Sequence, residues 1–305
     1  MTTLFLTHPT CELHAMGSHH PESPRRLAAI NAMVRERDWD SQLRTAAAPK
    51  LNSAHLATVH PKHHVEALLA LTPTEGLVAV DGDTLINPFS VAASLHAAGA
   101  ALEATDRVVD GTVDNAFCAV RPPGHHAESI AAMGFCLFNS IALAADYAIA
   151  QGFGRVAILD FDVHHGNGTV EIFQHRPEVL VCSSFQYPFY PGRHDRVRRP
   201  NICLTPLPAG TDSSAFRTAV ERDWSAALQR HRPEMIFISA GFDAHRQDPF
   251  GGLHLEDDDF SWVTRFIRDQ AQRYAGGRIV SLLEGGYHID ALTRSVAAHL
   301  EALAN

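Results

Sequence analysis

The feature that most constrains this chain is the stretch at residues 158–167, which reads ILDFDVHHGN. It begins inside an apolar run, residues 156–159, of the kind that fills a buried central strand, and it turns polar within three residues. Side chains alternate along an extended chain, so Asp160, Asp162 and His164 are expected on one face, near the carboxyl end of that strand. Ligands bind at this end of the strands in open α/β sheets. The stretch therefore predicts a site at the carboxyl edge of a parallel sheet.

The residue types in this stretch indicate a metal site. Two acids at a buried strand end need a cation or several donors to offset their desolvation, and no basic residue stands close by. A carboxylate and an imidazole two residues apart suit a divalent ion with mixed nitrogen and oxygen ligands, such as zinc. The alternative is a polar strand-to-loop turn followed by glycines.

Length and composition favour one soluble α/β domain over residues 1–305, because no linker, charge block or repeat divides the chain. The formal net charge of -9 argues against a nucleic-acid binder with a basic face, and the basic cluster at residues 193–199 is interpreted as a solvated loop. Five cysteines without CxxC spacing indicate reduced thiols in a cytoplasmic protein. No apolar run reaches membrane-spanning length, so no membrane partner is expected.

Hydrophobic periodicity and helix boundary signals predict alternating strands and helices. Strands are expected at residues 4–7, 117–120, 156–159, 179–183, 201–204, 235–239 and 278–283. Helices are expected at residues 24–37, 61–71, 88–109, 140–150, 169–173 and 213–231. A loop is expected over residues 11–24, between the first strand and the first helix.

Polar residues also follow three other predicted strands. His125 and His126 come after residues 117–120, Asp243 after residues 235–239 and Tyr287 after residues 278–283. Paired neutral imidazoles suit a general base and an electrostatic partner, because their ordinary pKa lies near the working pH. Since parallel strands end at one edge of their sheet, the pattern predicts the site of a doubly wound α/β enzyme.

Four motifs carry a resemblance to a known family. They are RPPGHHA at residues 121–127, DFDVHHGN at 160–167, GFDAH at 241–245 and LEGGY at 283–287. In this order and spacing they resemble the zinc-dependent histone deacetylase family, which includes bacterial acetylpolyamine amidohydrolases and acetoin-utilisation proteins. The resemblance covers nearly the whole chain. It implies the arginase/deacetylase fold, a single α/β domain with a central parallel sheet of about eight strands flanked by helices, and hydrolysis of an N-acyl amide.

The resemblance further implies a ligand set. Asp162, His164 and Asp243 would hold one zinc ion and leave room for water and the substrate carbonyl. Tyr287 would donate its hydroxyl to the oxyanion.

The same resemblance assigns proton transfer to the histidine pair. His126 would act as the base and then as the acid, and His125, held by Asp160, would act electrostatically beside it. Asn167 stands where many members carry an aspartate behind the base, which places the chain nearer the class II branch. No eukaryotic tail flanks the region, so a bacterial enzyme is expected.

Substrate contacts are implied for five residues. Gly134, Phe135 and Tyr190 resemble the walls of the family's narrow acyl-lysine tunnel, and Asp83 is either a turn acid or a rim residue. Phe250 occupies a rim position where the polyamine-selective eukaryotic branch has glutamate. An acylated lysine or amine is therefore the expected partner, with acetyl-lysine favoured over acetylated polyamines.

The family also binds potassium as a probable structural ion. The resemblance assigns this inner site to Asp160, Asp162, His164, Ser183 and Ser184. Ser184 and Phe185 replace a more usual Leu-His pair, which leaves a contact through backbone alone.

Three alternatives stay open. One is an acetylpolyamine amidohydrolase, and another is a binuclear manganese hydrolase of the arginase type, which needs further aspartates and a histidine. The third is a non-catalytic acyl-ligand sensor that keeps the fold. Natural substrate, acyl length and self-association into a homo-oligomer are not decided by the sequence.

Overall fold

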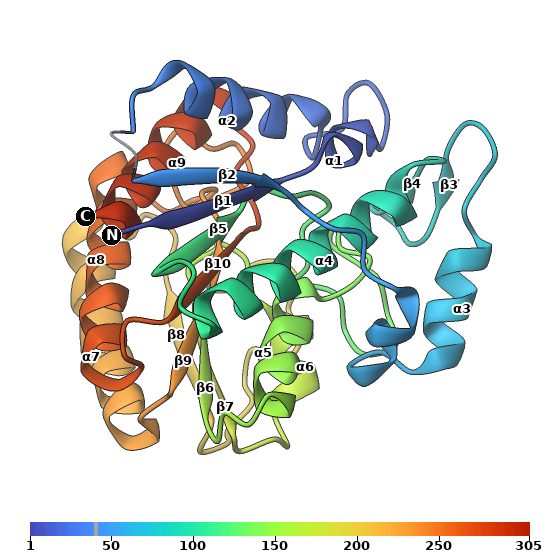
Figure 1. Ribbon diagram of the computed structural model, residues 1–305. Coiled ribbons are helices and arrows are strands. Elements are labelled where there is room, and N and C mark those ends of the chain that lie inside the picture. The colour runs from blue at the N-terminus through green and yellow to red at the C-terminus, as the bar shows by residue number, and fades with distance from the viewer. Residues whose placement is uncertain (40–41) are drawn as a thin grey trace.

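Eight parallel strands form the central sheet of the structure, a computed structural model that describes residues 1–39 and 42–305 (Figure 1). The strand order is β2-β1-β5-β10-β9-β6-β7-β8. The strands are β1 (Thr3–Thr7), β2 (Leu43–Ala47), β5 (Asn115–Cys118), β6 (Val156–Asp160), β7 (Val179–Gln186), β8 (Ile202–Leu207), β9 (Met235–Ala240) and β10 (Ile279–Leu283). The predicted single α/β domain with a parallel sheet of about eight strands is confirmed.

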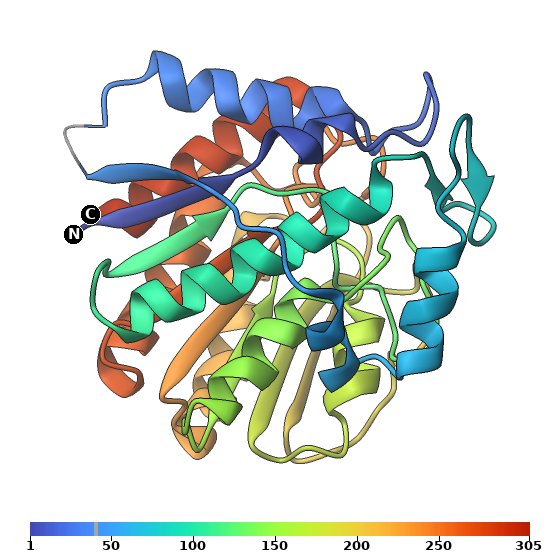
Figure 2. The same ribbon diagram turned by 45° about the vertical axis from the view of Figure 1, so that its right-hand side comes forward.

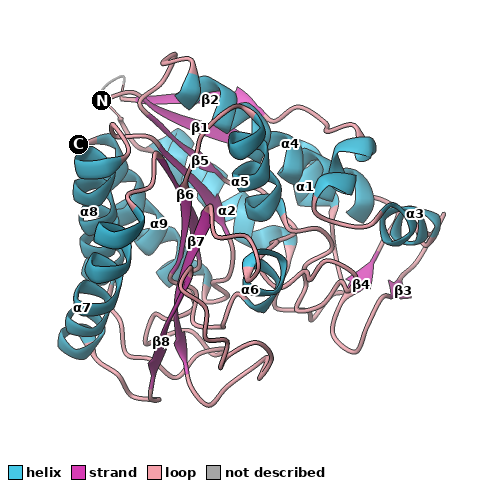
Figure 3. Ribbon diagram, turned by 90° about the horizontal axis from the view of Figure 1, so that it is seen from below, coloured by secondary structure: helices cyan, strands magenta, loops and turns pink. Residues whose placement is uncertain are grey.

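Helices cover both faces of the sheet, as Figure 3 shows from below. One layer consists of α7 (Ser213–His231), α8 (Asp257–Tyr274) and α9 (Ile289–Ala304), with α2 (Pro24–Glu36) packed against α9. The other consists of α4 (Ser90–Val109), α5 (Ser140–Ala150) and α6 (Asn167–Phe173). Strands β6, β7, β9 and β10 are buried along their whole length between these layers, which explains their continuous apolar runs.

Smaller elements lie outside the two helical layers. They are α1 (Pro9–Leu13), a 3₁₀ helix (Ser53–Thr58), α3 (Lys62–Ala70) and a hairpin of β3 (Val78–Ala79) and β4 (Leu85–Ile86). Helix α3 and the hairpin project to one side of the sheet (Figure 2). Within residues 1–39 and 42–305, no helix has both the length and the apolar character needed to cross a membrane.

All the predicted strands and helices are present, with ends that differ by one to a few residues. The prediction of a loop over residues 11–24 is wrong at its start, because residues 11–13 belong to α1. Pro9 occupies the first turn of that helix, and the His8 side chain accepts the Thr10 N–H at its start. Strand β2 was not predicted, since its residues are mostly exposed and show no alternation of apolar and polar side chains.

Candidate active site

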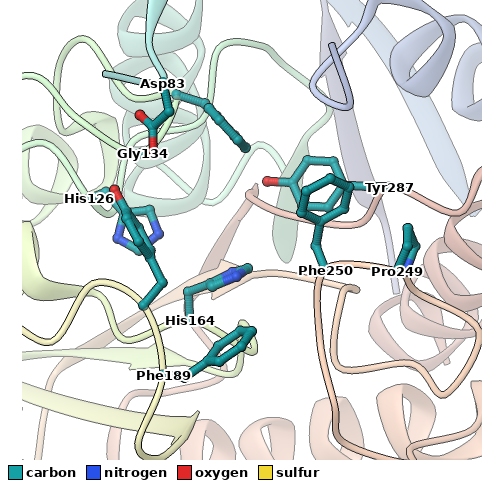
Figure 4. A pocket seen from close by; sticks show the side chains of 10 residues that line it. Asp83, His126, Gly134, His164, Phe189, Pro249, Phe250 and Tyr287 are labelled. Carbon is teal, nitrogen blue, oxygen red and sulfur yellow. The ribbon is translucent and has the colours of Figure 1, made fainter. Parts of the chain in front are cut away.

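Four neighbouring strands at the centre of the sheet deliver the candidate site. Strands β5, β10, β9 and β6 are adjacent, and His126, Tyr287, Asp243 and His164 lie in the segments that follow them. Three of them line a cavity of about 370 Å³, in which His126 and Tyr287 lie on opposite sides with His164 between them (Figure 4). The cavity is lined by Asp83, His126, Gly134, Phe135, His164, Phe189, Tyr190, Pro249, Phe250 and Tyr287.

The three predicted metal ligands lie together, and His164 joins this group to the cavity that it lines. One ligand atom from each of Asp162, His164 and Asp243 lies within 4.8 Å of the other two. His164 Nδ1 is 3.1 Å from Asp162 Oδ1 and 3.2 Å from Asp243 Oδ2. Ligand atoms about 2 Å from a tetrahedral zinc are themselves about 3.3 Å apart, so this spacing fits one ion bound by all three residues.

The charge balance of the three side chains also fits a cation. Across the described residues, the ion-pair partners of Asp162 and Asp243 are histidines. Burial and the neighbouring Asp162 raise the pKa of Asp243 to about 7. Burial alone would lower the pKa of His164, but its hydrogen bonds to Asp162 and Asp243 outweigh burial and raise it to about 10. The two buried carboxylates therefore share one imidazole proton and repel each other. A divalent ion bound between them would relieve this repulsion.

The local backbone holds the ligands in place. Strand β6 ends at Asp160, and Asp162 and His164 follow in bends, so simple alternation along an extended chain is not what groups them. Instead, Asp160 Oδ1 accepts the Asp162 N–H at 3.1 Å and Asp162 Oδ1 accepts the His164 N–H at 2.8 Å, in successive Asx turns. Asp160 therefore points to His125 rather than joining the ligand group.

Two motif glycines make room for the ligands. A Cβ at Gly241 would lie 2.0 Å from Asp162 Oδ2, and one at Gly285 would lie 2.0 Å from Asp243 Oδ2. Gly285 also donates its N–H to Asp162 Oδ2 at 2.8 Å. The glycines of GFDAH and LEGGY are needed because the backbone approaches the ligand carboxylates so closely.

The histidine pair is backed by two different groups. His125 Nδ1 lies 2.9 Å from Asp160 Oδ2, and His126 Nδ1 lies 2.7 Å from Asn167 Oδ1. Burial opposes charge on both rings, but the Asp160 and Asp162 carboxylates raise the pKa of His125 well above its ordinary value. Burial, together with the neighbouring histidines, holds the pKa of His126 well below its ordinary value. The pair can therefore supply one charged imidazolium and one neutral base.

Tyr287 is held by residues that the sequence reasoning missed. Asp248 Oδ2 accepts the N–H groups of Tyr287 at 2.6 Å and His288 at 3.0 Å. The Arg26 guanidinium lies 4.9 Å from the centre of the Tyr287 ring, and its Nε donates to the Gly286 carbonyl at 2.6 Å. Burial raises the pKa of Tyr287 well above its ordinary value, so its hydroxyl remains a donor.

Comparisons with known proteins identify the family of this chain. The family model for the histone deacetylase domain matches residues 20–303. The chain belongs to the histone deacetylase family. A histone deacetylase-like amidohydrolase of Pseudomonas aeruginosa is 37% identical over 93% of this chain and 81% of its own length. A probable deacetylase of Archaeoglobus fulgidus is 33% identical, with 95% of this chain and 82% of that protein covered.

A solved structure supports the same assignment. The crystal structure of the HDA15 HD domain matches with a TM-score of 0.93 and 32% identity, over 99% of this chain and 88% of that chain. Membership of the histone deacetylase family supports deacetylase or amidohydrolase activity.

Aromatic residues form the upper walls of this deacetylase-family cavity. Phe135 lies 6.0 Å from Tyr287 between ring centres, and Tyr190 lies 5.2 Å from His126. Phe189, which the sequence reasoning did not single out, stacks on His164 with a 5.4 Å centroid distance and a 16° interplanar angle. Its neighbour Tyr190 in the same segment was the only signal that could have pointed to it.

The remaining predicted contact residues also line the cavity. Gly134 has a φ of 56°, and a Cβ there would lie 2.5 Å from His126 Cδ2. Phe250 packs against Tyr287 at 5.1 Å between ring centres, and Asp83 lies at the opposite wall (Figure 4). Thr84 Oγ1 donates to Asp83 Oδ1 and accepts the Phe135 N–H, which ties the β3–β4 hairpin to the wall.

Three of the five residues predicted for potassium lie close together on the paired strands β6 and β7. Asp160 and Ser183 are register partners on these strands, and Ser184 Oγ donates to the Asp160 carbonyl at 3.4 Å. The Ser183 hydroxyl also contacts His165 Nδ1 at 3.0 Å.

Buried charged residues that hold the motif segments were also missed. Arg121 donates to both carboxylate oxygens of Glu22, at 2.5 and 2.6 Å, and Arg26 donates to the same carboxylate at 3.0 Å. Glu284 accepts the N–H groups of Gly124 at 2.7 Å and His125 at 3.2 Å. Arg121 and Glu284 stand inside the recognised motifs, which was the only signal for them.

Proposed function

We propose that this chain is a zinc-dependent deacylase that hydrolyses N-acyl amides, above all those of the acetyl-lysine type. The observation that carries the proposal is the set of three convergent ligands, Asp162, His164 and Asp243, of which His164 lines the same cavity as His126 and Tyr287. Deacetylases and amidohydrolases among the relatives support the reaction class.

Asp162, His164 and Asp243 would hold the zinc, and catalytic zinc sites commonly have three protein ligands with a further position open. When bound, the ion supplies a Lewis acid that polarises the acyl carbonyl and makes water a stronger acid. The proposed ligand set is supported by the 3.1 and 3.2 Å spacings and by the competing carboxylates.

Proton transfer falls to the histidine pair. His126 is the neutral imidazole of the cavity, so it takes a proton from the attacking water at Nε2 and returns one to the leaving amine. His125 keeps its charge through Asp160 and stabilises the negative charge that develops beside it. The two roles follow from the different groups behind the two rings.

Tyr287 would complete the site from the opposite wall. Its hydroxyl donates to the acyl oxygen, and this interaction strengthens as the oxygen gains charge, which lowers the barrier. Arg26 and Asp248 fix the segment that carries the ring.

The aromatic walls favour a substrate with an alkyl stem, such as acyl-lysine. Phe250 at the rim leaves the second ammonium of a polyamine without a carboxylate partner at that position. Asp83 at the opposite wall favours the second candidate, an acetylpolyamine amidohydrolase, because it could pair with that ammonium. An arginase-type pair of manganese ions is less well supported, since the described part of the chain offers one metal-ligand group. A sensor without activity would have no use for His126 and Tyr287 in these positions.

We also propose a potassium ion at Asp160, Asp162, His164, Ser183 and Ser184, with a structural role beneath the zinc. The proximity of Asp160, at the end of β6, to Ser183 and Ser184 on the neighbouring β7 supports it. A cytoplasmic protein without nucleic-acid or membrane partners remains our proposal for the cellular setting.

The test combines metal analysis with turnover of a fluorogenic acetyl-lysine amide. We expect one zinc per chain, loss of turnover on chelation and its return on addition of zinc. A fully metallated protein that turns over neither acetyl-lysine nor acetylated polyamines, yet binds them, would favour the sensor. Activity that depends on two manganese ions would favour the arginase type.

A further inference from the structure

A second layer of contacts lies behind the base, at Asn167. Its Oδ1 faces His126 Nδ1 at 2.7 Å, and its Nδ2 donates to Glu128 Oε1 at 2.8 Å. The other contacts of Nδ2 are longer, 3.3 Å to the His126 carbonyl and 3.4 Å to Met133 Sδ. Among the contacts of Asn167 Nδ2, the one with Glu128 is therefore the shortest.

The side-chain amide of Asn167 can face His126 in two different orientations, whereas the two oxygens of a carboxylate are equivalent. The two ends of the amide differ, since one accepts and the other donates hydrogen bonds, so the orientation of Asn167 decides which tautomer of His126 it stabilises. The Glu128 carboxylate can only accept, so the NH2 group must face it and Oδ1 must face His126. In that orientation His126 carries its hydrogen on Nδ1 and leaves Nε2 free to take a proton.

Glu128 is itself fixed. Only 4% of the residue is exposed, Arg193 Nη2 donates to its Oε2 at 2.6 Å, and His194 Nε2 lies 3.4 Å from its Oε1. Arg193 and His194 belong to the segment after β7 that also carries Tyr190 in the cavity wall. The same loop therefore forms part of the substrate wall and anchors the carboxylate behind the base.

We propose that Glu128 is a positioning residue that fixes the amide of Asn167 and thereby sets the reactive tautomer of His126. Arg193 keeps the Glu128 side chain in place from the outer side. This inference rests on the proposed deacylase function for its kinetic test, and a tautomer measurement tests it separately.

The first experiment compares three variants. Glu128→Ala removes the acceptor, and we expect kcat to fall about 10-fold with KM nearly unchanged. The fall is smaller than the whole contribution of a general base, because His126 remains and only part of its population has the wrong tautomer. Glu128→Gln keeps an oxygen for Asn167 and should stay within about 3-fold of the wild type. Glu171→Ala is the matched control, because Glu171 binds the neighbouring Ser129 through both its carboxylate oxygens. It should leave kcat unchanged.

The second experiment is a rescue. A carboxylate at position 167 accepts at both oxygens, so Glu128→Ala combined with Asn167→Asp needs no orienting partner and should recover most of the lost kcat. Asn167→Asp alone should have a low kcat, because its carboxylate would face the Glu128 carboxylate across the present 2.8 Å contact. The inference is overturned if Glu128→Ala keeps wild-type kcat, if the rescue fails, or if Glu171→Ala loses as much as Glu128→Ala.

The third measurement does not depend on turnover. Nitrogen-15 NMR of histidine-labelled protein distinguishes protonated from bare ring nitrogens, and the His126 signals are assigned by their loss in His126→Gln. The wild type should show hydrogen on Nδ1, and Glu128→Ala should show a mixture of tautomers. An unchanged tautomer in Glu128→Ala overturns the inference. A wild-type protein with the expected tautomer but no deacylase turnover would instead refute the proposed function.

Discussion

The floor of the cavity, where His164 is backed by the buried Asp162 and Asp243, differs in kind from its rim, formed by Phe189, Tyr190 and Phe250. The floor carboxylates are buried, and each accepts at least one backbone N–H besides facing His164. The rim rings are 36 to 38% exposed and are held by contacts with other rings. The cavity therefore has buried, hydrogen-bonded carboxylates at its floor and partly exposed aromatic rings at its entrance.

The difference has an energetic origin. A buried charge that loses its partner pays the desolvation cost without compensation, so a floor residue can change only together with its neighbours. A ring at the water boundary loses mainly part of its apolar contact when it is replaced, which costs far less. We infer that the floor fixes the reaction and that the rim is where substrate choice can vary.

The largest effect is expected at the floor. Asp243→Ala removes one of three proposed protein ligands and should lower bound zinc and reduce turnover by more than about 1,000-fold. The exposed Asp258→Ala, on the first turn of α8, is the control and should keep both. Metal analysis and turnover on the same samples check the prediction. Stoichiometric zinc with near wild-type turnover in Asp243→Ala would remove Asp243 from the ligand set.

The next effect is expected at Tyr287, where floor and rim meet. Tyr287→Phe keeps the ring contacts with Phe135 and Phe250 but deletes the donor, and losing one such donor costs about 100- to 1,000-fold in turnover. Zinc content and the binding of a zinc-directed inhibitor should be unchanged. Turnover within about 3-fold of the wild type would show that another group stabilises the oxyanion.

A smaller effect is expected at Gly134, in the wall above the base. An alanine Cβ there would lie 2.5 Å from His126 Cδ2, so the ring must move, and we expect about a 10-fold fall in kcat. Gly111→Ala is the matched control, because Gly111 also has a positive φ, 72°, but no atom of the described residues lies within 4 Å of the Cβ that an alanine would add. Both variants should lose about 1 kcal/mol of stability from the left-handed backbone. Equal kcat in the two variants would show that the wall tolerates the shift.

Most of the floor could be predicted because its signals are local. Asp162 and His164 stand two residues apart after an apolar strand, and Asp243 follows another strand in the same way. Parallel strands then bring these ends to one edge, as β6 and β9 do in the structure. The predicted alternation of side chains from residue 160 onward was wrong, because hydrogen bonds between side chain and backbone replace the strand after Asp160.

The support behind the floor could not be predicted in the same way. Arg26 lies 258 residues from Glu284, whose carbonyl it contacts, and an arginine in a helix gives no local sign that it is buried. Asp248 holds Tyr287 across 39 residues through backbone N–H groups that have no residue signature. Strand β2 was missed for a related reason, since an exposed edge strand is specified by pairing with β1 and not by its own pattern. Long-range contacts of this kind appear only in the folded chain.

The smallest effect on turnover, and the sharpest on selectivity, is expected at the rim. Phe250 packs on the outer side of Tyr287 and is 38% exposed, so Phe250→Glu should fold normally and leave zinc content unchanged. A rim carboxylate can pair with the second ammonium of an acetylated polyamine, which an aromatic ring meets only through a weaker cation–π contact. Lysine within a peptide presents a neutral backbone there, which the ring accepts without leaving a charge unpaired.

The measurement is kcat/KM on an acetyl-lysine peptide and on N-acetylputrescine, for the wild type, Phe250→Glu and the uncharged control Phe250→Gln. The wild type should favour the peptide, and Phe250→Glu should gain about 5-fold on the polyamine relative to Phe250→Gln, which corresponds to about 1 kcal/mol for one new charge pair at a partly exposed site. Asp83 at the opposite wall sets the competing outcome, because it already offers a carboxylate to the cavity. If the wild type prefers the polyamine and Asp83→Asn does not, then Asp83 determines the substrate choice. That result would refute the assignment of substrate choice to Phe250.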